Sequence, residues 1–254
     1  MKRICLLTTL ALACLLCGPA AAHFGMVIPS DNMVMEEDNR TVTLDLSFSH
    51  PMEIIGMDLV SPKSFTVTHE GKATDLGKSL KPIKVIDHPA WTADYKIKRP
   101  GAYTFVMEPK PYWEPAEDCY IIHYTKTVVV AFGDDEGWDE ELGLKIEIVP
   151  LAKPYAQYKG NVFQGIVKMD GKAVPYAEVE VEYYNKDGKL KAPTDYMITQ
   201  TVKADGAGVF TYAAPFAGWW GFAALNTADF TIPFEGKDKD VELGAVLWVH
   251  FEDF

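Results

Sequence analysis

The sequence predicts an all-β protein built from two β-sandwich domains, and three observations support this prediction. Several short segments alternate polar and apolar residues with a period of two, among them Thr41–Phe48 and Ser64–Thr68. Turn-forming residues separate these segments, as at 69–72 and 99–101. No long segment has the 3.6-residue period of an amphipathic helix. Short strands at this spacing are typical of a sandwich or a barrel.

The first predicted domain covers residues 23–152. Its further strands are expected at Tyr103–Val106 and Lys145–Ile148, which alternate, and at Thr127–Phe132. The last of these is almost wholly apolar or β-branched, which is typical of a central strand. A stiff segment rich in proline and tyrosine, residues 150–160, predicts the boundary with the second domain.

The second predicted domain covers residues 153–254 and opens a new series of strands. These are expected at 161–168, 177–184, 209–212 and 219–222. The series resembles the transthyretin-like or carboxypeptidase-regulatory sandwich. The residues that carry this resemblance are Gly165-x-Val167, Gly171-x-x-Val174-Pro175-x-Ala177-x-Val179, Asp205-Gly206-x-Gly208-x-Phe210 and a late aromatic strand. The resemblance concerns the fold and says little about function.

The first 22 residues have the composition of a secretory signal peptide. Lys2 and Arg3 precede an apolar run that is too short to span a membrane, and Ala20-Ala21-Ala22 follows. We therefore expect export and cleavage after Ala22. The alternative is a lipoprotein acylated at Cys14 or Cys17, although the residues before both cysteines fit such a site poorly.

The overall charge and the lack of common catalytic motifs limit the range of possible functions. The 254 residues carry a formal net charge of −12, which argues against nucleic acid as a partner and is compatible with cations. The sequence has no His-Glu-x-x-His, no paired Cys-x-x-Cys, no phosphate-binding glycine loop and no Gly-x-Ser-x-Gly. We therefore expect a binding protein and not an enzyme.

Cleavage after Ala22 makes His23 the new N-terminal residue. Its free α-amino group and its imidazole Nδ1 can close one chelate ring on a metal ion. Both groups are neutral enough near pH 7 to coordinate, with ordinary pKa values of about 7.7–8.0 and about 6.5. Nickel, cobalt, copper and zinc suit such nitrogen ligands. The alternative is that peptidase cleavage exposes an arbitrary residue.

A second histidine follows the strand predicted at Thr41–Phe48. If the extended backbone continues, His50 and Met52 point to the same face and offer an imidazole and a thioether to a soft or borderline metal. The alternative is a loop histidine beside a core methionine.

A third candidate lies between Pro111 and Lys126, where an acidic loop precedes a strand. We expect His123 to be a metal ligand. Cys119 is the only cysteine after residue 22, and it is either a buried small hydrophobe or a soft ligand. Glu117 or Asp118 would serve as a direct ligand or as a partner of one, and the role of Glu114 stays open. The alternative is a solvated acidic loop.

The three remaining histidines have no ligand-type neighbours in the sequence. We interpret His69, His88 and His250 as structural or solvent-facing.

Five segments together resemble the periplasmic component associated with bacterial energy-coupling-type cobalt/nickel uptake transporters. They are His23–Ser30, Ser49–Met52, Pro111–Asp118, His123–Lys126 and Ala217–Phe222. The resemblance covers essentially the whole chain after residue 22. It implies a periplasmic protein that binds nickel or cobalt and serves the integral-membrane subunits of a transporter.

The expected metal site therefore consists of His23, His50 and His123, with Met52 as a weak axial contact. Three other functions stay open: a periplasmic copper carrier, a copper-dependent polysaccharide monooxygenase with a histidine brace, and an interaction module without metal. Copper(II) would bind such a site most tightly in any case. A single cysteine after cleavage counts against the monooxygenase.

Overall fold

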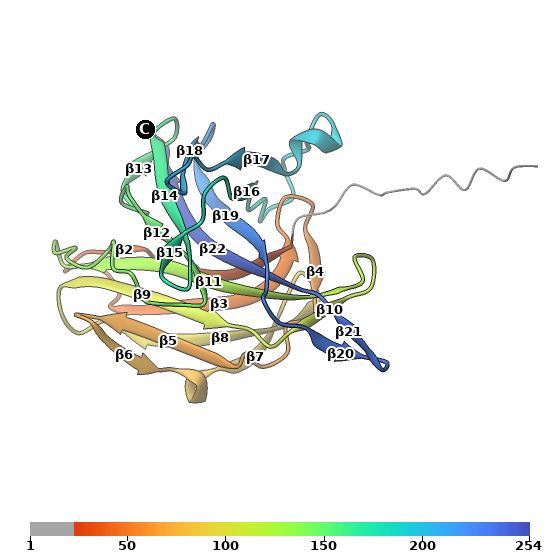
Figure 1. Ribbon diagram of the computed structural model, residues 1–254. Helices are drawn as coiled ribbons and strands as arrows, with labels where there is room; N and C mark the ends of the chain where they lie inside the picture. Colours follow the sequence, from red (N-terminus) through yellow and green to blue (C-terminus); the bar gives the residue numbers. More distant parts are fainter. Residues whose placement is uncertain (1–22) are drawn as a thin grey trace, which may run out of the picture.

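The computed structural model describes residues 23–254 (Figure 1). The expected signal peptide, its cleavage after Ala22 and the alternative acylation of Cys14 or Cys17 lie outside the described residues. The prediction of an all-β sandwich protein is confirmed. The described chain consists of strands, connecting loops and two single-turn 3-10 helices, η1 (Gly77–Ser79) and η2 (Asp195–Met197). Within residues 23–254 no helix has the length and hydrophobicity needed to cross a bilayer.

An 11-stranded sheet runs through both halves of the molecule (Figure 1). Its main path is β17 (Gln200–Lys203), β16 (Glu178–Tyr183), β19 (Gly218–Thr227), β22 (Val241–Glu252), β11 (Cys119–Ala131), β9 (Gly101–Glu108), β5 (Ser64–His69) and β6 (Lys72–Asp75). Three short strands pair beside this path: β10 (Tyr112–Glu114), β2 (Met33–Val34) and β13 (Gln157–Tyr158).

Two smaller sheets and a hairpin complete the fold. The first sheet contains β1 (Phe24–Pro29), β3 (Thr41–His50), β8 (His88–Lys96), β7 (Lys81–Val85) and β4 (Ile55–Met57). The second contains β12 (Ile146–Pro150), β14 (Val162–Met169), β15 (Lys172–Ala173) and β18 (Val209–Ala213). β20 (Ile232–Phe234) and β21 (Lys237–Lys239) form the hairpin.

The two main hydrophobic cores lie on opposite faces of the long sheet. Consecutive residues of a strand point to opposite faces. On β11, Ile121 accordingly packs into the core under β1, β3 and β8, whereas Ile122 packs into the core under β12, β14 and β18. Each small sheet thus forms a sandwich with part of the long sheet, and the two sandwiches share its middle strands.

The structure differs from the predicted domain division in two respects. β12 was assigned to residues 23–152, but it pairs with β14, and its Ile146 and Ile148 belong to the second core. The last strand, β22, pairs in parallel with β11 of the first half. The chain therefore crosses between the sandwiches before β12, and one hydrogen-bonded sheet spans the boundary expected near residue 152.

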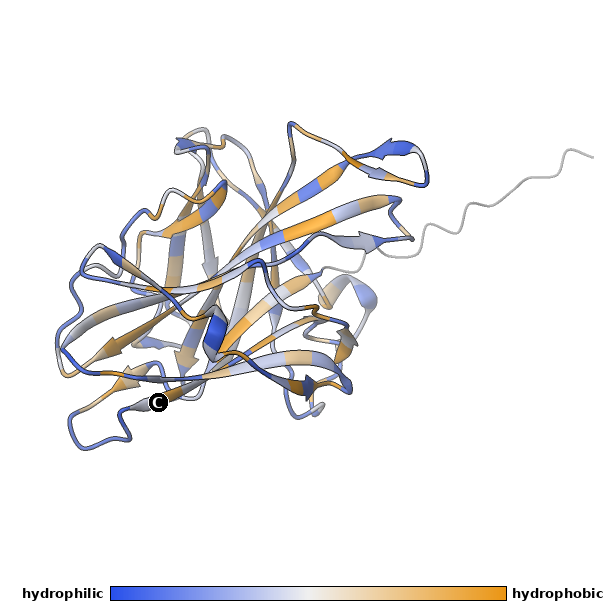
Figure 2. Cartoon of the chain, turned by 90° about the horizontal axis from the view of Figure 1, so that it is seen from below, coloured by the Kyte–Doolittle hydropathy of each residue, from blue (hydrophilic) through white to orange (hydrophobic). Residues whose placement is uncertain are grey.

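Hydropathy follows this architecture. In Figure 2 the hydrophobic colour is concentrated along the strands, and the connecting loops are mostly hydrophilic. Strands that are covered on both faces, such as β22, are buried along nearly their whole length.

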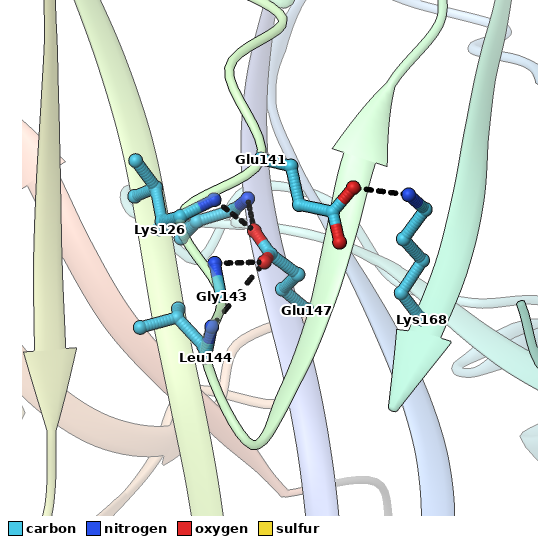
Figure 3. Close-up of polar contacts among 7 residues, drawn as sticks. Lys126, Glu141, Gly143, Leu144, Glu147 and Lys168 are labelled. Carbon is cyan, nitrogen blue, oxygen red and sulfur yellow. Dashed lines mark hydrogen bonds and ion pairs between the residues drawn. The ribbon is translucent and has the colours of Figure 1, made fainter. Parts of the chain in front are cut away.

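A buried ion pair joins the long sheet to the second small sheet (Figure 3). Lys126 on β11 donates to Glu147 on β12 over 2.7 Å between Nζ and Oε2, and both side chains are at least 98% buried. The other carboxylate oxygen of Glu147 accepts hydrogen bonds from the backbone N–H of Gly143 at 2.7 Å and Leu144 at 3.3 Å. The loop before β12 is therefore folded around this carboxylate. Burial lowers the pKa of Lys126, and the adjacent Glu147 opposes that effect.

Lys126→Met should destabilise the protein by about 3–5 kcal/mol, because it leaves the carboxylate of Glu147 buried without its counter-charge. Lys168→Met is the matched control, since it removes the cation of the more exposed Lys168–Glu141 pair and should cost at most about 1 kcal/mol. Urea unfolding followed by tryptophan fluorescence measures both variants. Equal losses of unfolding free energy in the two variants would show that the buried pair contributes no more to stability than the more exposed pair.

Candidate functional site

The start of the first strand brings two of the predicted histidines together. In the antiparallel β1–β3 ladder Phe24 pairs with Ser49, so the register places His23, one residue earlier, opposite His50. Their ring centroids are 4.6 Å apart with an angle of 54° between the ring planes. Both residues are only 8% exposed. The pair is therefore a buried cross-strand contact of two imidazoles.

Glu114 is the third member of this cluster. Its Oε2 lies 3.0 Å from Nε2 of His23, and its Oε1 accepts a 2.9 Å hydrogen bond from the backbone N–H of Ala116. Glu114 ends β10, which pairs with the start of β11 and brings this carboxylate to His23. With Nε2 of His23 bound to this carboxylate, Nδ1 is the nitrogen left for another partner.

The environment of His23 favours its neutral form. Burial lowers the pKa of its imidazole, the neighbouring imidazole of His123 lowers it further, and the carboxylate of Glu114 only partly opposes these effects. Neutral imidazole is the form that coordinates metals.

His123 lies close to this pair but makes a different contact. It is 1% exposed, and its Nε2 lies 3.0 Å from Oε1 of Glu242 on β22. The ring of Phe48 lies 5.8 Å from that of His23 and 6.0 Å from that of His123, measured between centroids. His123 therefore shares an aromatic neighbour with His23, while its own polar partner is Glu242.

A glycine makes the position of His123 possible. In the β11–β22 register His123 pairs with Gly244. A Cβ atom on Gly244 would lie 2.2 Å from Cδ2 and 2.6 Å from Nε2 of the imidazole. The ring thus occupies the space that any other side chain at position 244 would need.

Met52 does not lie where the sequence pattern predicted. β3 ends at His50, and residues 51–54 form a turn in which Ile54 has φ of 59°. The backbone N–H of Met52 donates to Glu182 at 3.2 Å, and its carbonyl accepts from Asn185 at 3.1 Å. The prediction that His50 and Met52 share one strand face is wrong, because the extended backbone stops between them.

The remaining ligand candidates in the acidic loop have other partners. Asp118 pairs with Lys239 of the β20–β21 hairpin. The thiol of Cys119 is partly buried and lies 3.9 Å from Glu117, and burial together with the nearby carboxylates raises its pKa to about 11. A thiol that stays protonated is a poor metal ligand. Burial and the negative charges of Glu242 and Glu114 also raise the pKa of Glu117.

The side chains alone do not build the full predicted site. Among residues 23–254, no group of three or more His, Cys, Asp or Glu side chains has a geometry that could hold a metal ion. His23 and His50 are brought together with Glu114, whereas His123 pairs with Glu242 and Met52 lies in a turn. The α-amino group of His23, which would be free after cleavage, is the predicted ligand that is not a side chain.

The three histidines interpreted as structural have partners away from this cluster. His69 stacks on Tyr103 with ring centroids 4.0 Å apart. His88 bonds to Asp58 at 2.7 Å, and His250 bonds to Glu252 at 3.0 Å.

Sequence reasoning missed a carboxylate partner of His123 on β22 and two carboxylates with raised pKa values on β16. Glu242 is one, and Glu180 and Glu182 are two more on the face of β16 opposite to Val179 and Val181. Burial, with the charges of nearby glutamates, raises the pKa of Glu180 to about 7. Burial raises that of Glu182 to about 8, although Thr199 and Met52 donate hydrogen bonds to it. The alternation of 177–184 marks these positions as one face, but it does not show what covers that face.

Fold and site together define a β-sandwich protein with a buried pair of histidines at the start of its first strand. The chain belongs to a family described as a domain of unknown function (DUF4198), whose model matches residues 20–228. No curated protein matches the sequence.

Solved structures share only a distant likeness with the chain. The D0-D1 domain of Intimin is 13% identical with a TM-score of 0.26, and the match covers 88% of this chain and 99% of that one. Fibronectin(III)-like modules of Clostridium thermocellum CbhA are 10% identical with a TM-score of 0.23, over 90% and 95% of the two chains. A putative carbohydrate binding protein from Bacteroides uniformis is 12% identical with a TM-score of 0.25, over 87% and 97%. No residue role follows from these alignments.

Glu180→Gln should change how stability depends on pH. A carboxyl whose pKa rises on folding stabilises the native state at low pH, and this contribution is lost as the pH rises through the folded pKa, here about 7. When the pH is raised from 5 to 9, the unfolding free energy of the variant should therefore increase by roughly 1–3 kcal/mol relative to that of the wild type. Urea unfolding at both pH values measures this gain.

Glu178→Gln is the matched control, because Glu178 lies two residues earlier on β16 and is exposed. If both variants followed the wild-type pH dependence, the native state would not hold Glu180 in its protonated form.

Proposed function

We propose that this protein is an exported nickel- or cobalt-binding protein that captures the ion at His23 and His50 and delivers it to a membrane uptake transporter. The single observation that carries the proposal is the buried contact of these two imidazoles, whose ring centroids lie 4.6 Å apart. Export and delivery to a transporter are supported by the composition of residues 1–22 and by the family resemblance of the sequence motifs.

The contact between Glu114 and His23 fits this chemistry. A metal-bound histidine commonly donates its other ring N–H to a carboxylate, which fixes the tautomer and orients the ring. Glu114 holds Nε2 of His23, so Nδ1 is available together with the α-amino nitrogen of the same residue. These two nitrogens would close one chelate ring, and His50 would add a second imidazole.

Two predicted ligands have a smaller part in this proposal. His123 pairs with Glu242, and Met52 is in the turn after β3, so the proposed first ligands are His23 and His50. Copper(II) would also bind such a nitrogen site tightly. Metal analysis of protein purified from the periplasm without added metal would distinguish nickel or cobalt transport from copper carriage.

Blocking the N-terminus should abolish tight metal binding. When Ala22 or an added Met precedes His23, the nitrogen of His23 is an amide whose lone pair is delocalised, so the amine–imidazole ring cannot close. The extended protein should fold normally yet bind nickel and cobalt far more weakly than protein that begins at His23. Isothermal titration calorimetry measures both forms after mass spectrometry has verified their N-termini. Equal affinities would remove His23 as a chelating residue.

His50→Ala and Glu114→Ala should each weaken nickel binding. The first removes an imidazole, and the second releases the ring of His23, a type of change that typically lowers metal affinity about 10–100-fold. Calorimetry on protein beginning at His23 measures the loss, with the folded state checked by circular dichroism.

Two matched controls separate a ligand effect from a general loss of histidine or carboxylate. His88→Ala removes a half-exposed histidine that bonds to Asp58, and Glu117→Ala removes an exposed carboxylate from the same loop as Glu114. Both controls should leave the nickel affinity nearly unchanged. Control variants that weakened binding as much as His50→Ala would argue against the proposed site.

A further inference from the structure

The short strand β10 carries Glu114 to His23 and is held in the sheet on one side only. It pairs with the start of β11 over its three residues, Tyr112–Glu114. Within the described chain no strand pairs with its other edge. A two-stranded ladder of this length is marginally stable by itself. The position of Glu114 therefore depends on what packs against β10.

The β20–β21 hairpin packs against the face of β10 opposite to Glu114. Consecutive residues of a strand point to opposite faces, so Trp113 points away from the side on which Glu114 meets His23. The ring of Trp113 stacks on that of Phe234 of β20, with centroids 4.0 Å apart and 16° between the ring planes. The hairpin thus fixes the residue directly before Glu114.

Lys239 of β21 fixes the turn that follows Glu114. Its Nζ lies 2.5 Å from both carboxylate oxygens of Asp118, which ends the turn of residues 115–118. The same Nζ lies 5.7 Å from the ring centroid of Trp113, and the side chain of Lys239 is only 15% exposed. A cation shielded from water interacts more strongly with its partners than one at the open surface.

Side chains alone make these contacts between the hairpin and β10. β20 and β21 pair with each other and with no other strand in residues 23–254. Figure 1 shows the hairpin extending from the body beside β10. The stack and the ion pair can therefore be removed by single substitutions that leave every ladder hydrogen bond in place.

We propose that the β20–β21 hairpin is a clasp that keeps the carboxylate of Glu114 on Nε2 of His23. Phe234 and Lys239 are its positioning residues, since they act through β10 and the turn after it. The effect of the clasp on metal affinity rests on the proposed function, whereas the clasp itself can be tested without metal.

The first measurement follows the ring N–H of His23 by NMR in metal-free, 15N-histidine-labelled protein that begins at this residue. A carboxylate accepts, so Nε2 of His23 carries the hydrogen that Glu114 binds. This hydrogen should give a resonance protected from exchange with water, identified by its loss in Glu114→Ala. The ring N–H of His123, bonded to Glu242, is the internal reference for an intact fold.

Phe234→Ala and Lys239→Met should each lose the His23 resonance and keep that of His123. The matched controls Phe230→Ala and Lys237→Met remove exposed side chains from the same segment and should keep both resonances. Retention of the His23 signal in both clasp variants, or an equal loss in the controls, would overturn the clasp, whether or not the protein binds metal.

The second measurement is the nickel affinity of the same variants by calorimetry. Phe234→Ala should weaken binding about 3–10-fold, less than Glu114→Ala, because the carboxylate is loosened and not removed. In the Glu114→Ala background the same substitution should cause no further loss, since the clasp acts through that carboxylate. An equal further loss in both backgrounds would overturn this route. Wild type that showed the expected resonances but bound no nickel would refute the metal proposal and leave the clasp in place.

Discussion

The parallel pairing of β11 with β22 is the interaction on which the rest of the structure depends. The ladder runs from Tyr120 opposite Val241 to Thr127 opposite Trp248, so residues about 120 positions apart become neighbours. Both strands are buried on both faces, as parallel pairs in a sheet usually are. One face supports the core of the first sandwich and the other supports the core of the second. The pair of Lys126 and Glu147 then fixes the second small sheet against this ladder.

The histidine cluster is a consequence of how closely β1 approaches this sheet. A Cβ atom on Gly25 would lie 2.2 Å from Oγ1 of Thr125, and one on Gly221 would lie 2.8 Å from the ring of Phe24. The two glycines thus let the first strand lie directly against β11 and β19. That approach buries His23, and its pairing with β3 brings it to His50. The metal site that we propose therefore lies where the first strand meets the long sheet.

The sequence was sufficient to predict those features of the fold that depend on local patterns. Alternation located β3, β5, β14 and β18 nearly to their ends, because one face of each strand is buried. It failed for Met52, since a turn begins directly after His50, and for the position of β12, since alternation does not show which sheet a strand joins. Glu114 and Glu242 were missed as partners of histidines for a related reason. Their contacts are made across 91 and 119 residues, and no local pattern encodes such distant pairing.

The position of β22 also has a consequence for how the protein reaches its native state. Because β22 comes about 120 residues after β11 along the described chain and β11 needs it as a neighbour, the long sheet cannot close until both segments are present. Closing so long a loop costs conformational entropy before the β11–β22 contacts can compensate for it, and this makes folding slow. Until then the edge of β11 that β22 covers keeps its backbone N–H and C=O groups unpaired, and such an edge can pair with other chains.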